Sequence, residues 1–273
     1  MSPDSPGPGP GPGSGARGPL DGGALRQRAR RGDVTFGTFL GMASVMAAEA
    51  CAAAGPDWLL VDLEHGAGGE EQVSAVVPAA AAYGVPTLVR VESAARNRAG
   101  RVLDLGAAGV MFPRLETGAE VAEALLHLRY PPEGDRGVAT YNRACRFGLD
   151  PGALARASDE VLGVVQVESA RAVANVEEMA ANPGADVLFV GPRDLSQDLG
   201  VPGDYSSPRF AAALEAVLAA ARRHGKGAGI MVPDGASAAR RAEQGWSFIA
   251  IASDVALLAV ATQAQLGEAR ARS

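Results

Sequence analysis

The sequence predicts an α/β protein built as a (β/α)₈ barrel, on three observations. Eight short apolar runs alternate with Ala-rich, charge-dotted segments of helical period along most of the chain. These runs are apolar throughout, as expected for strands that are buried on both faces of a parallel sheet. Glycine recurs where predicted helices meet strands, which is the position of a helix C-terminal cap. Eight such units on roughly 250 residues match the size of this barrel.

Each predicted strand is a short run that is rich in β-branched, aromatic or other large apolar residues. The first predicted strand leads into GMASVMAAE, which is not a G-x-G-x-x-G turn, and this disfavours the alternative of a doubly wound open sheet. The predicted strands are Phe36–Gly41, Trp58–Leu63, Thr87–Val91, Gly109–Phe112, Val161–Val167, Asp186–Val190, Gly227–Met231 and Ser247–Ile251.

Each predicted helix lies between two of these strands, and the connection between the fourth and fifth strands is longer than the others. That connection contains RYPPEGDRG at Arg129–Gly137, where two prolines prevent a continuous helix. A long connection of this kind is usually functional or lies at an interface. The predicted helices are Ala43–Ala54, Glu70–Tyr83, Arg96–Leu105, Thr117–Leu128, Arg171–Ala181, Pro208–His224 and Gly235–Gln244.

Composition excludes several classes of protein. The 273 residues are 47% apolar and 21% charged, so the chain can bury a large core. The net charge of −6 disfavours general binding to nucleic acid or to anionic membranes. Cys51 and Cys145 are the only cysteines, which excludes a disulfide scaffold and a cysteine-based zinc cluster. The absence of a long apolar stretch excludes a membrane span, and we predict a reduced, cytoplasmic protein.

The first 20 residues differ from the rest of the chain. They alternate proline and glycine and contain almost nothing that could enter a core, which predicts a disordered tail. They also lack the apolar central run of a secretory signal peptide. We therefore predict a single barrel domain over residues 21–273.

Polar residues follow the ends of several predicted strands, which is where the active sites of such barrels lie. Carboxylates, a histidine and an arginine therefore converge at one rim, and this combination is a stronger indication of chemistry than any single motif. The polar residues of the rim are Asp62, Glu64, His65, Arg90, Gln166, Glu168, Ser169, Arg193, Asp194, Asp234, Ser253 and Asp254.

Glu168 and Asp194 follow adjacent strands, so their carboxylates can meet. Two neighbouring carboxylates repel one another unless a proton or a cation lies between them, and a hard divalent cation with several retained waters suits such oxygen ligands. The alternative is that Glu168 caps the helix predicted from Arg171 and that Asp194 caps its own turn.

Two further rim residues have both a functional and a structural interpretation. His65 is the only histidine at a predicted strand end, where it can act as a general base at neutral pH or bond to a backbone carbonyl. Arg90 lies within an apolar strand, so its charge needs a partner. That partner is an anionic substrate oxygen or a structural carboxylate, Asp62 or Glu64.

Two basic or turn-forming segments are weaker candidates. Gly191-Pro192-Arg193-Asp194 forces a sharp turn, and its exposed amides can bind a substrate carboxylate, although Gly-Pro is a common turn. The long connection carries four arginines, which either form a solvated or subunit-contacting face or capture an acidic substrate group. They are Arg129, Arg136, Arg143 and Arg146.

Six segments in the same order resemble the HpcH/HpaI aldolase family, the metal-dependent class II aldolases of 4-hydroxy-2-oxo acids, and the resemblance spans about Ala24 to Leu258. The segments are DWLLVDLEHG at Asp57–Gly66, LVRV at Leu88–Val91, LDLGAAGVMFPRLET at Leu103–Thr117, RYPPEGDRGV at Arg129–Val138, QVES at Gln166–Ser169 and VGPRDLS at Val190–Ser196.

This resemblance implies a barrel of the pyruvate/phosphoenolpyruvate type, a homo-oligomer of dimers or a hexamer with a swapped last helix, and Mg²⁺, Mn²⁺ or Co²⁺ as cofactor. It implies that Glu168 and Asp194 bind the metal. It implies that Arg90 contacts the keto oxygen of pyruvate and that His65 is the base.

The resemblance also implies a supporting set of residues. Asp62 belongs to the polar network around the base His65. Asp104 is the partner of His65 across a subunit contact. Gln166 and the segment Gly191, Pro192 and Arg193 lie at the pyruvate carboxylate. The implied reaction is cleavage or formation of a 4-hydroxy-2-oxo acid through a metal-bound pyruvate enolate, with an aldehyde as the other product.

Several observations bear on alternatives. The only lysine, Lys226, enters the seventh strand rather than ending one, which argues against an imine-forming aldolase. Arg193, Glu92 and Leu63 depart from the pattern of the family and leave the aldehyde open. Since fold does not determine function, we keep oxaloacetate decarboxylation, a decarboxylating synthase, a coenzyme A thioester lyase and a non-catalytic keto-acid-binding barrel as alternatives.

Overall fold

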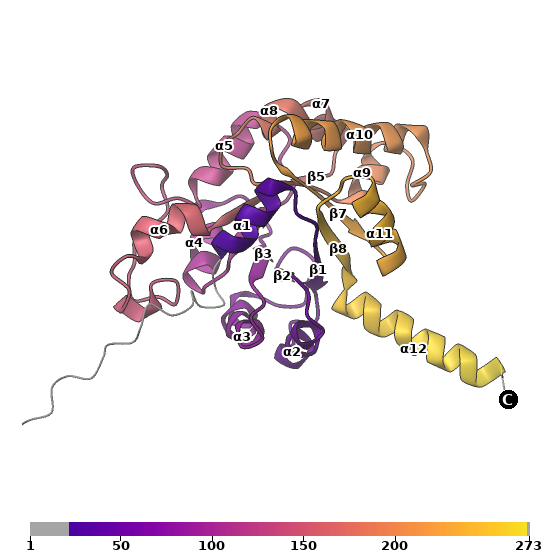
Figure 1. The fold of residues 1–273 in the computed structure, drawn as a ribbon, viewed down its shortest axis with the longest axis horizontal. Coiled ribbons are helices and arrows are strands. Elements are labelled where there is room, and N and C mark those ends of the chain that lie inside the picture. Colours follow the sequence, from indigo (N-terminus) through magenta and orange to yellow (C-terminus); the bar gives the residue numbers. More distant parts are fainter. Residues whose placement is uncertain (1–21, 272–273) are drawn as a thin grey trace, which may run out of the picture.

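The computed structural model describes residues 22–271, which contain a closed barrel of eight parallel strands in sequence order. Strand β8 pairs with β1 to close the barrel, and helices cover its outside (Figure 1). The predicted fold class and all eight predicted strands are confirmed, with no end shifted by more than two residues. The strands are β1 (Thr35–Leu40), β2 (Trp58–Asp62), β3 (Thr87–Arg90), β4 (Gly109–Phe112), β5 (Leu162–Val167), β6 (Val187–Val190), β7 (Gly227–Val232) and β8 (Phe248–Ser253).

The helices include every predicted helix and several that the sequence pattern did not reveal. The helix predicted over Arg171–Ala181 is interrupted at Asn175, whose side chain donates to the carbonyl of Glu116 at 2.8 Å. The helices are α1 (Gly22–Arg31), α2 (Val45–Ala53), α3 (Glu70–Ala81), α4 (Arg96–Asp104), α5 (Gly118–Leu126), α6 (Ala153–Glu160), α7 (Ala170–Ala174), α8 (Val176–Ala180), α9 (Pro192–Asp198), α10 (Pro208–Arg223), α11 (Gly235–Glu243) and α12 (Asp254–Ala271), with a 3₁₀ turn η1 (Arg146–Gly148).

The tail predicted over residues 1–20 lies outside the described residues, as do residues 21, 272 and 273. Within residues 22–271, no helix has the length and apolar character needed to cross a membrane.

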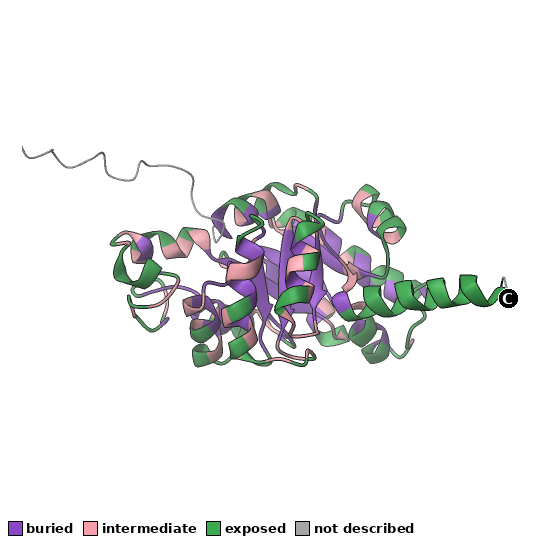
Figure 2. Cartoon of the chain, turned by 90° about the horizontal axis from the view of Figure 1, so that it is seen from below, coloured by how far each residue is buried: buried purple, intermediate pink, exposed green. Residues whose placement is uncertain are grey.

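The interior of the barrel is filled by large side chains from alternate positions of the strands. Trp58 stacks on Phe248 with ring centroids 4.3 Å apart. Gly37 lies against this stack, and a Cβ at that position would be 2.2 Å from the Trp58 ring. The absence of a side chain on β1 therefore makes room for the indole of β2. Figure 2 shows the buried strands at the centre, surrounded by partly exposed helices.

Helix α1 covers the amino-terminal end of the barrel. Its residues Leu25 and Ala29 belong to the same buried cluster as the interior residues of the strands. A second, larger cluster lies between the outer faces of the strands and the helices. The barrel is thus closed by apolar packing at one end, and its carboxyl end is the one that carries polar side chains.

The connection between β4 and β5 forms helix α5, a segment without helix over 128–145, the turn η1 and helix α6. The prediction that RYPPEGDRG is not a continuous helix is confirmed. Two of the four arginines of this connection, Arg129 and Arg136, are buried, so the interpretation of the four as a solvated face is wrong for these two.

Helix α12 leaves the barrel after β8 and projects away from it (Figure 1). Only its first residue, Asp254, is buried. Its exposed apolar side chains include Val255, Leu257, Leu258, Val260 and Leu266.

Candidate active site

Several polar side chains at the carboxyl end of the barrel continue the rows of side chains that point into its interior. On β2 the inward positions are Trp58, Leu60 and then Asp62, because side chains of a strand alternate between its two faces. By the same period, Leu88 is followed by Arg90 on β3. Strand period thus places a carboxylate and a guanidinium at the last inward position of neighbouring strands.

Arg90 is held by two carboxylates. Its Nε and Nη2 donate to the two oxygens of Asp62 at 2.9 and 2.7 Å, and its Nη1 lies 3.0 Å from an oxygen of Glu64. Arg90 and Asp62 are each 8% exposed. The structural interpretation of Arg90 as a partner of Asp62 and Glu64 is therefore correct in this chain, and the arrangement holds the guanidinium rigidly at the rim.

The electrostatics of this pair favour its charged form. Burial by itself raises the pKa of Asp62, but hydrogen bonds from Arg90 and from the amides of His65 and Glu64 outweigh it, so the pKa lies below its usual value. Burial by itself lowers the pKa of Arg90. The hydrogen bonds and charges of Asp62 and Glu64 outweigh this effect, so the pKa of Arg90 is raised.

Glu168 extends the inward row of β5 beyond Gln166. Its Oε1 accepts from the amide of Arg114 at 2.8 Å, and its Oε2 accepts from Nε2 of Gln166. Burial, followed by the nearby charges of Glu64 and Asp194, raises the pKa of Glu168 despite the opposing effect of Arg114 and Arg90. The alternative that Glu168 caps the next helix is wrong, because Ser169 is the N-cap of α7 and accepts from Ala172 at 3.0 Å.

Asp194 lies in the first turn of α9, which begins with Pro192 directly after Gly191. The segment predicted as a sharp turn is therefore a helix start, where proline is favoured and a carboxylate is stabilised by the helix dipole. Gly191 faces the two β5 side chains: a Cβ there would lie 2.9 Å from Nε2 of Gln166 and 3.1 Å from Oε2 of Glu168.

The donor set at this rim fits a hard divalent cation. Glu168 feels the charge of Asp194, and the buried Oε1 of Gln166 has no hydrogen-bond partner among residues 22–271. Gln166 is 2% exposed, so an unpaired oxygen there is costly. Among residues 22–271, no three His, Cys, Asp or Glu side chains gather around one point as a metal cage. Two carboxylates, with water completing the shell, are the ligands that these residues can supply.

His65 is exposed in the loop between β2 and α3, one residue after Glu64. Its backbone amide donates to Oδ1 of Asp62 at 3.3 Å. Asp62 therefore orients both the Arg90 guanidinium and the backbone that carries the imidazole.

Asp104 does not join this group within one chain. It is the last residue of α4, which runs back from the carboxyl end of β3, and its Oδ1 accepts from Nη2 of the buried Arg136 at 2.7 Å. The guanidinium of Arg136 also lies 4.5 Å from the Tyr130 ring centroid. The role of Asp104 across a subunit contact stays a prediction.

Two other strand-end carboxylates have structural roles. Asp234 caps α11 by accepting from the amide of Ser237 at 2.7 Å. Asp254 is buried and accepts from the amides of Gly41 and Met42 at 2.8 and 3.2 Å, which ties the end of β8 to the end of β1. Strand-end position alone did not distinguish these two from the candidate ligands.

Arg114 is the contributor to the site that sequence reasoning missed. Its φ of 58° lies in the left-handed region, which is unusual for a residue with a side chain. This conformation accompanies the hydrogen bond from its amide to Glu168. The available signal was its position two residues after the end of β4, but its contribution comes from the backbone, which no residue type reveals.

Known proteins resemble this chain over most of its length. The profile of the family described as HpcH/HpaI aldolase/citrate lyase matches residues 35–261. A hydroxypyruvate/pyruvate aldolase of Paraburkholderia phytofirmans is 40% identical over 252 residues, which cover 90% of this chain and 97% of that protein. A 5-keto-4-deoxy-D-glucarate aldolase of Klebsiella pneumoniae is 36% identical over 84% of this chain and 90% of its own length.

A solved structure shows the same architecture. The crystal structure of an HpcH/HpaI aldolase/citrate lyase family protein from Burkholderia cenocepacia matches with a TM-score of 0.87 and 41% identity, covering 91% of this chain and 99% of that one.

Proposed function

The chain belongs to the HpcH/HpaI aldolase/citrate lyase family, a family of lyases, and on that premise we propose that it is a divalent-metal-dependent pyruvate aldolase. It would cleave or form 4-hydroxy-2-oxo acids, with pyruvate as one product and an aldehyde as the other. The observation that carries the proposal is the buried Arg90, held by Asp62 and Glu64 beside the half-buried carboxylate of Glu168.

Glu168 and Asp194 would hold Mg²⁺, Mn²⁺ or Co²⁺. When bound, the cation supplies a Lewis acid that withdraws charge from the oxygens of the keto acid. Burial and the neighbouring charges of Glu64 and Asp194 raise the pKa of Glu168, and a cation bound there would offset both effects.

Arg90 would stabilise the developing enolate oxygen. Its guanidinium is preorganised by bidentate contact with Asp62, so little reorganisation is needed as charge develops. The backbone amides of Arg193 and Asp194 would donate to the carboxylate of the keto acid, and Gln166 lies beside this segment, against Gly191.

His65 would accept the proton of the C4 hydroxyl as the carbon–carbon bond breaks, and would return it in the reverse reaction. The exposed position of the imidazole is compatible with this role, because the aldehyde half must enter from the open carboxyl end of the barrel.

We also propose that the protein is a homo-oligomer in which α12 packs on a second copy. Helix α12 exposes Val255, Leu258 and Val260 to solvent in the single chain, and an extended apolar surface of this kind usually marks an interface.

The test uses purified protein stripped with a chelator and then supplied with each metal. Oxaloacetate and 4-hydroxy-2-oxo acids are offered separately, and pyruvate release is followed with a coupled assay. We expect metal-restored release from the hydroxy-oxo acids. Release from oxaloacetate alone would favour the decarboxylase alternative, and no release with any metal would refute the proposed lyase activity.

A further inference from the structure

The loop between β2 and α3, which carries His65, is held at two points. At its start, Asp62 accepts from the amides of Glu64 and His65 at 3.1 and 3.3 Å. Two residues beyond His65, the amide of Ala67 donates to the carbonyl of Gly41 at 3.0 Å. The position of the imidazole therefore depends on the residue that follows β1 as well as on β2.

Gly41 is itself fixed by a buried carboxylate. Asp254 accepts from the amide of Gly41 at 2.8 Å and from the amide of Met42 at 3.2 Å. Asp254 is 5% exposed and is the first residue of α12. A chain of hydrogen bonds thus runs from the start of α12, through the end of β1, to the loop that carries His65.

The two loops are also in close backbone contact. A Cβ on Gly66 would lie 2.1 Å from the carbonyl oxygen of Asp62, and one on Gly68 would lie 2.6 Å from the side chain of Ala43. Ala43 has a φ of 53°, which a residue with a side chain rarely adopts. Such a conformation persists only where the surrounding structure fixes it, and the bonds to Asp254 fix the two residues before Ala43.

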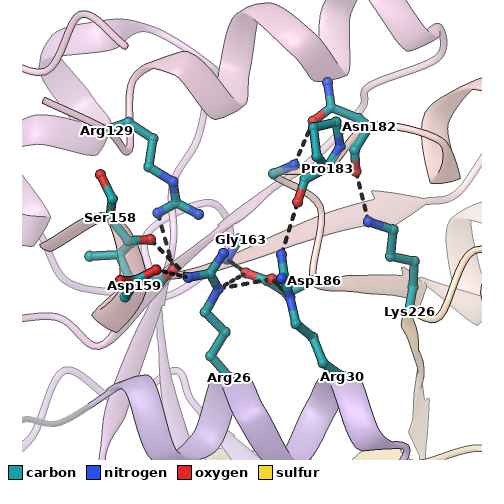
Figure 3. Close-up of polar contacts among 12 residues, drawn as sticks. Arg26, Arg30, Arg129, Ser158, Asp159, Gly163, Asn182, Pro183, Asp186 and Lys226 are labelled. Carbon is teal, nitrogen blue, oxygen red and sulfur yellow. Dashed lines mark hydrogen bonds and ion pairs between the residues drawn. The ribbon is translucent and has the colours of Figure 1, made fainter. Parts of the chain in front are cut away.

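A second buried carboxylate provides a contrast at the opposite end of the barrel. Asp186 is fully buried and accepts from Nε of Arg26 at 3.0 Å and from the amide of Gly163 at 2.9 Å (Figure 3). These bonds fasten α1 to β5. Because Asp186 precedes β6, it lies at the amino-terminal end of the strands, away from the rim that carries His65.

We propose that Asp254 is a positioning residue for His65, an inference that rests on the proposed role of His65 as the base. Asp254 acts through the carbonyl of Gly41 and the amide of Ala67, which set where the His65 loop lies. A displacement of about 1 Å at a reacting group can slow a reaction by about 100-fold. Loss of Asp254 should therefore impair the step that needs the imidazole more than any other step.

The test compares Asp254→Ala with wild type, using the purified full chain supplied with the metal. Cleavage of a 4-hydroxy-2-oxo acid and decarboxylation of oxaloacetate are followed in the same pyruvate-coupled assay. We expect kcat for cleavage to fall about 10- to 100-fold with little change in KM. Decarboxylation needs no hydroxyl deprotonation and should fall far less. Asp254→Asn keeps one oxygen as an acceptor and should cause a smaller loss.

Combined substitutions show whether Asp254 acts through His65. In a His65→Ala background, Asp254→Ala should cause no further loss of cleavage, because the group that it positions is already absent. Gly66→Ala displaces the same loop directly, since its Cβ would meet the carbonyl of Asp62, and should also lower cleavage more than decarboxylation. This variant tests the inference even if Asp254→Ala fails to fold.

Asp186→Asn is the matched control. It removes a buried carboxylate at the amino-terminal end of the barrel, so it should lower the Tm without changing the ratio of cleavage to decarboxylation. Asp234→Asn, at the exposed start of α11, is a second control for the loss of a strand-end carboxylate and should also leave this ratio unchanged.

Hydrogen exchange separates this inference from the proposed function. Measured by mass spectrometry without substrate, Asp254→Ala should speed the exchange of amides in residues 63–69, whereas Asp186→Asn should not. Faster exchange there supports the link between Asp254 and the loop whether or not the protein releases pyruvate. Unchanged exchange would overturn the inference, as would equal losses of cleavage and decarboxylation in Asp254→Ala, or a further loss of cleavage in the His65→Ala background.

Discussion

At the scale of single residues, Asp62 connects the parts of the rim. It takes both Nε and Nη2 of Arg90 and receives the backbone amides of Glu64 and His65. With four donors around it, the Asp62 carboxylate orients the guanidinium of Arg90 on β3 and the loop that follows β2. Its substitution should therefore affect stability and catalysis together, whereas a change at His65 should affect catalysis alone.

His65→Ala should separate aldol cleavage from decarboxylation. The substitution leaves the backbone amide that bonds to Asp62 and removes only the imidazole. Loss of a general base costs about 10²- to 10⁴-fold in kcat for cleavage of a hydroxy-oxo acid. Oxaloacetate decarboxylation needs no hydroxyl deprotonation and should fall much less. Equal losses with both substrates, measured in the same pyruvate-coupled assay, would argue against His65 as the base.

The Asp62–Arg90 pair should make stability depend on pH in the acid range. Because the folded-state pKa of Asp62 is lowered, its contribution is present above the unfolded-state pKa of about 3.9 and is lost as pH falls through the folded-state value. We expect Asp62→Asn to reduce the free energy of unfolding by about 3 kcal/mol at pH 7, since it removes the buried carboxylate that accepts two hydrogen bonds from Arg90 and leaves the guanidinium with Glu64.

The difference between wild type and Asp62→Asn should shrink below pH 4, as measured by urea unfolding across pH. Asp33→Asn is the matched control, because Asp33 pairs with Arg31 at the surface and both side chains are well exposed. A pH-independent penalty for Asp62→Asn would contradict the assignment.

Among the elements of the barrel, β1 carries Gly37 at the point where β2 places the large side chain of Trp58, and the packing of the interior depends on this pairing. Gly37→Ala would place a Cβ 2.2 Å from the Trp58 ring, which is fully buried and stacked on Phe248. Overpacking of this kind costs about 1–3 kcal/mol, so the Tm should fall. Gly100→Ala, within α4 and with open space around it, should instead raise stability by about 1 kcal/mol. Equal Tm values for the two variants would refute this packing account.

The pattern of apolar residues in the sequence predicted the strands of this protein better than its helices. The strands were found because each is a short buried run. Helices α9 and α12 were missed for different reasons. Helix α9 is seven residues long and starts directly after Gly191, and α12 begins with a continuous apolar run, Val255–Ala261, and buries no residue beyond Asp254. The kink at Asn175 depends on a bond to Glu116, which lies far away in sequence.

For the molecule as a whole, the exposed apolar side chains of α12 lead us to expect a homo-oligomer. Leu258→Glu combined with Val260→Glu should shift the protein to a smaller species in size-exclusion chromatography with light scattering, because two charges would be buried in the interface. Gln263→Glu, which changes the charge of the same helix at a polar position, is the control. A wild type that is monomeric would refute the proposed oligomer.

The order of the strands, the barrel they form and the set of polar residues at the strand ends could be predicted from the sequence alone. These properties are local: alternation along each strand places Asp62, Arg90 and Gln166 in the inward row, and short apolar runs mark the strands. The six matching segments added the family, which the comparisons confirmed.

Which polar residues meet depends on the tertiary structure. It paired Arg90 with Asp62 and Glu64, aimed the amide of Arg114 at Glu168, and showed that Asp254 holds β1 to β8. It also buried Arg129 in the connection between β4 and β5. These contacts join residues far apart in the chain, and they depend on how the barrel closes and which side chains lose contact with water, neither of which is a local property of the sequence.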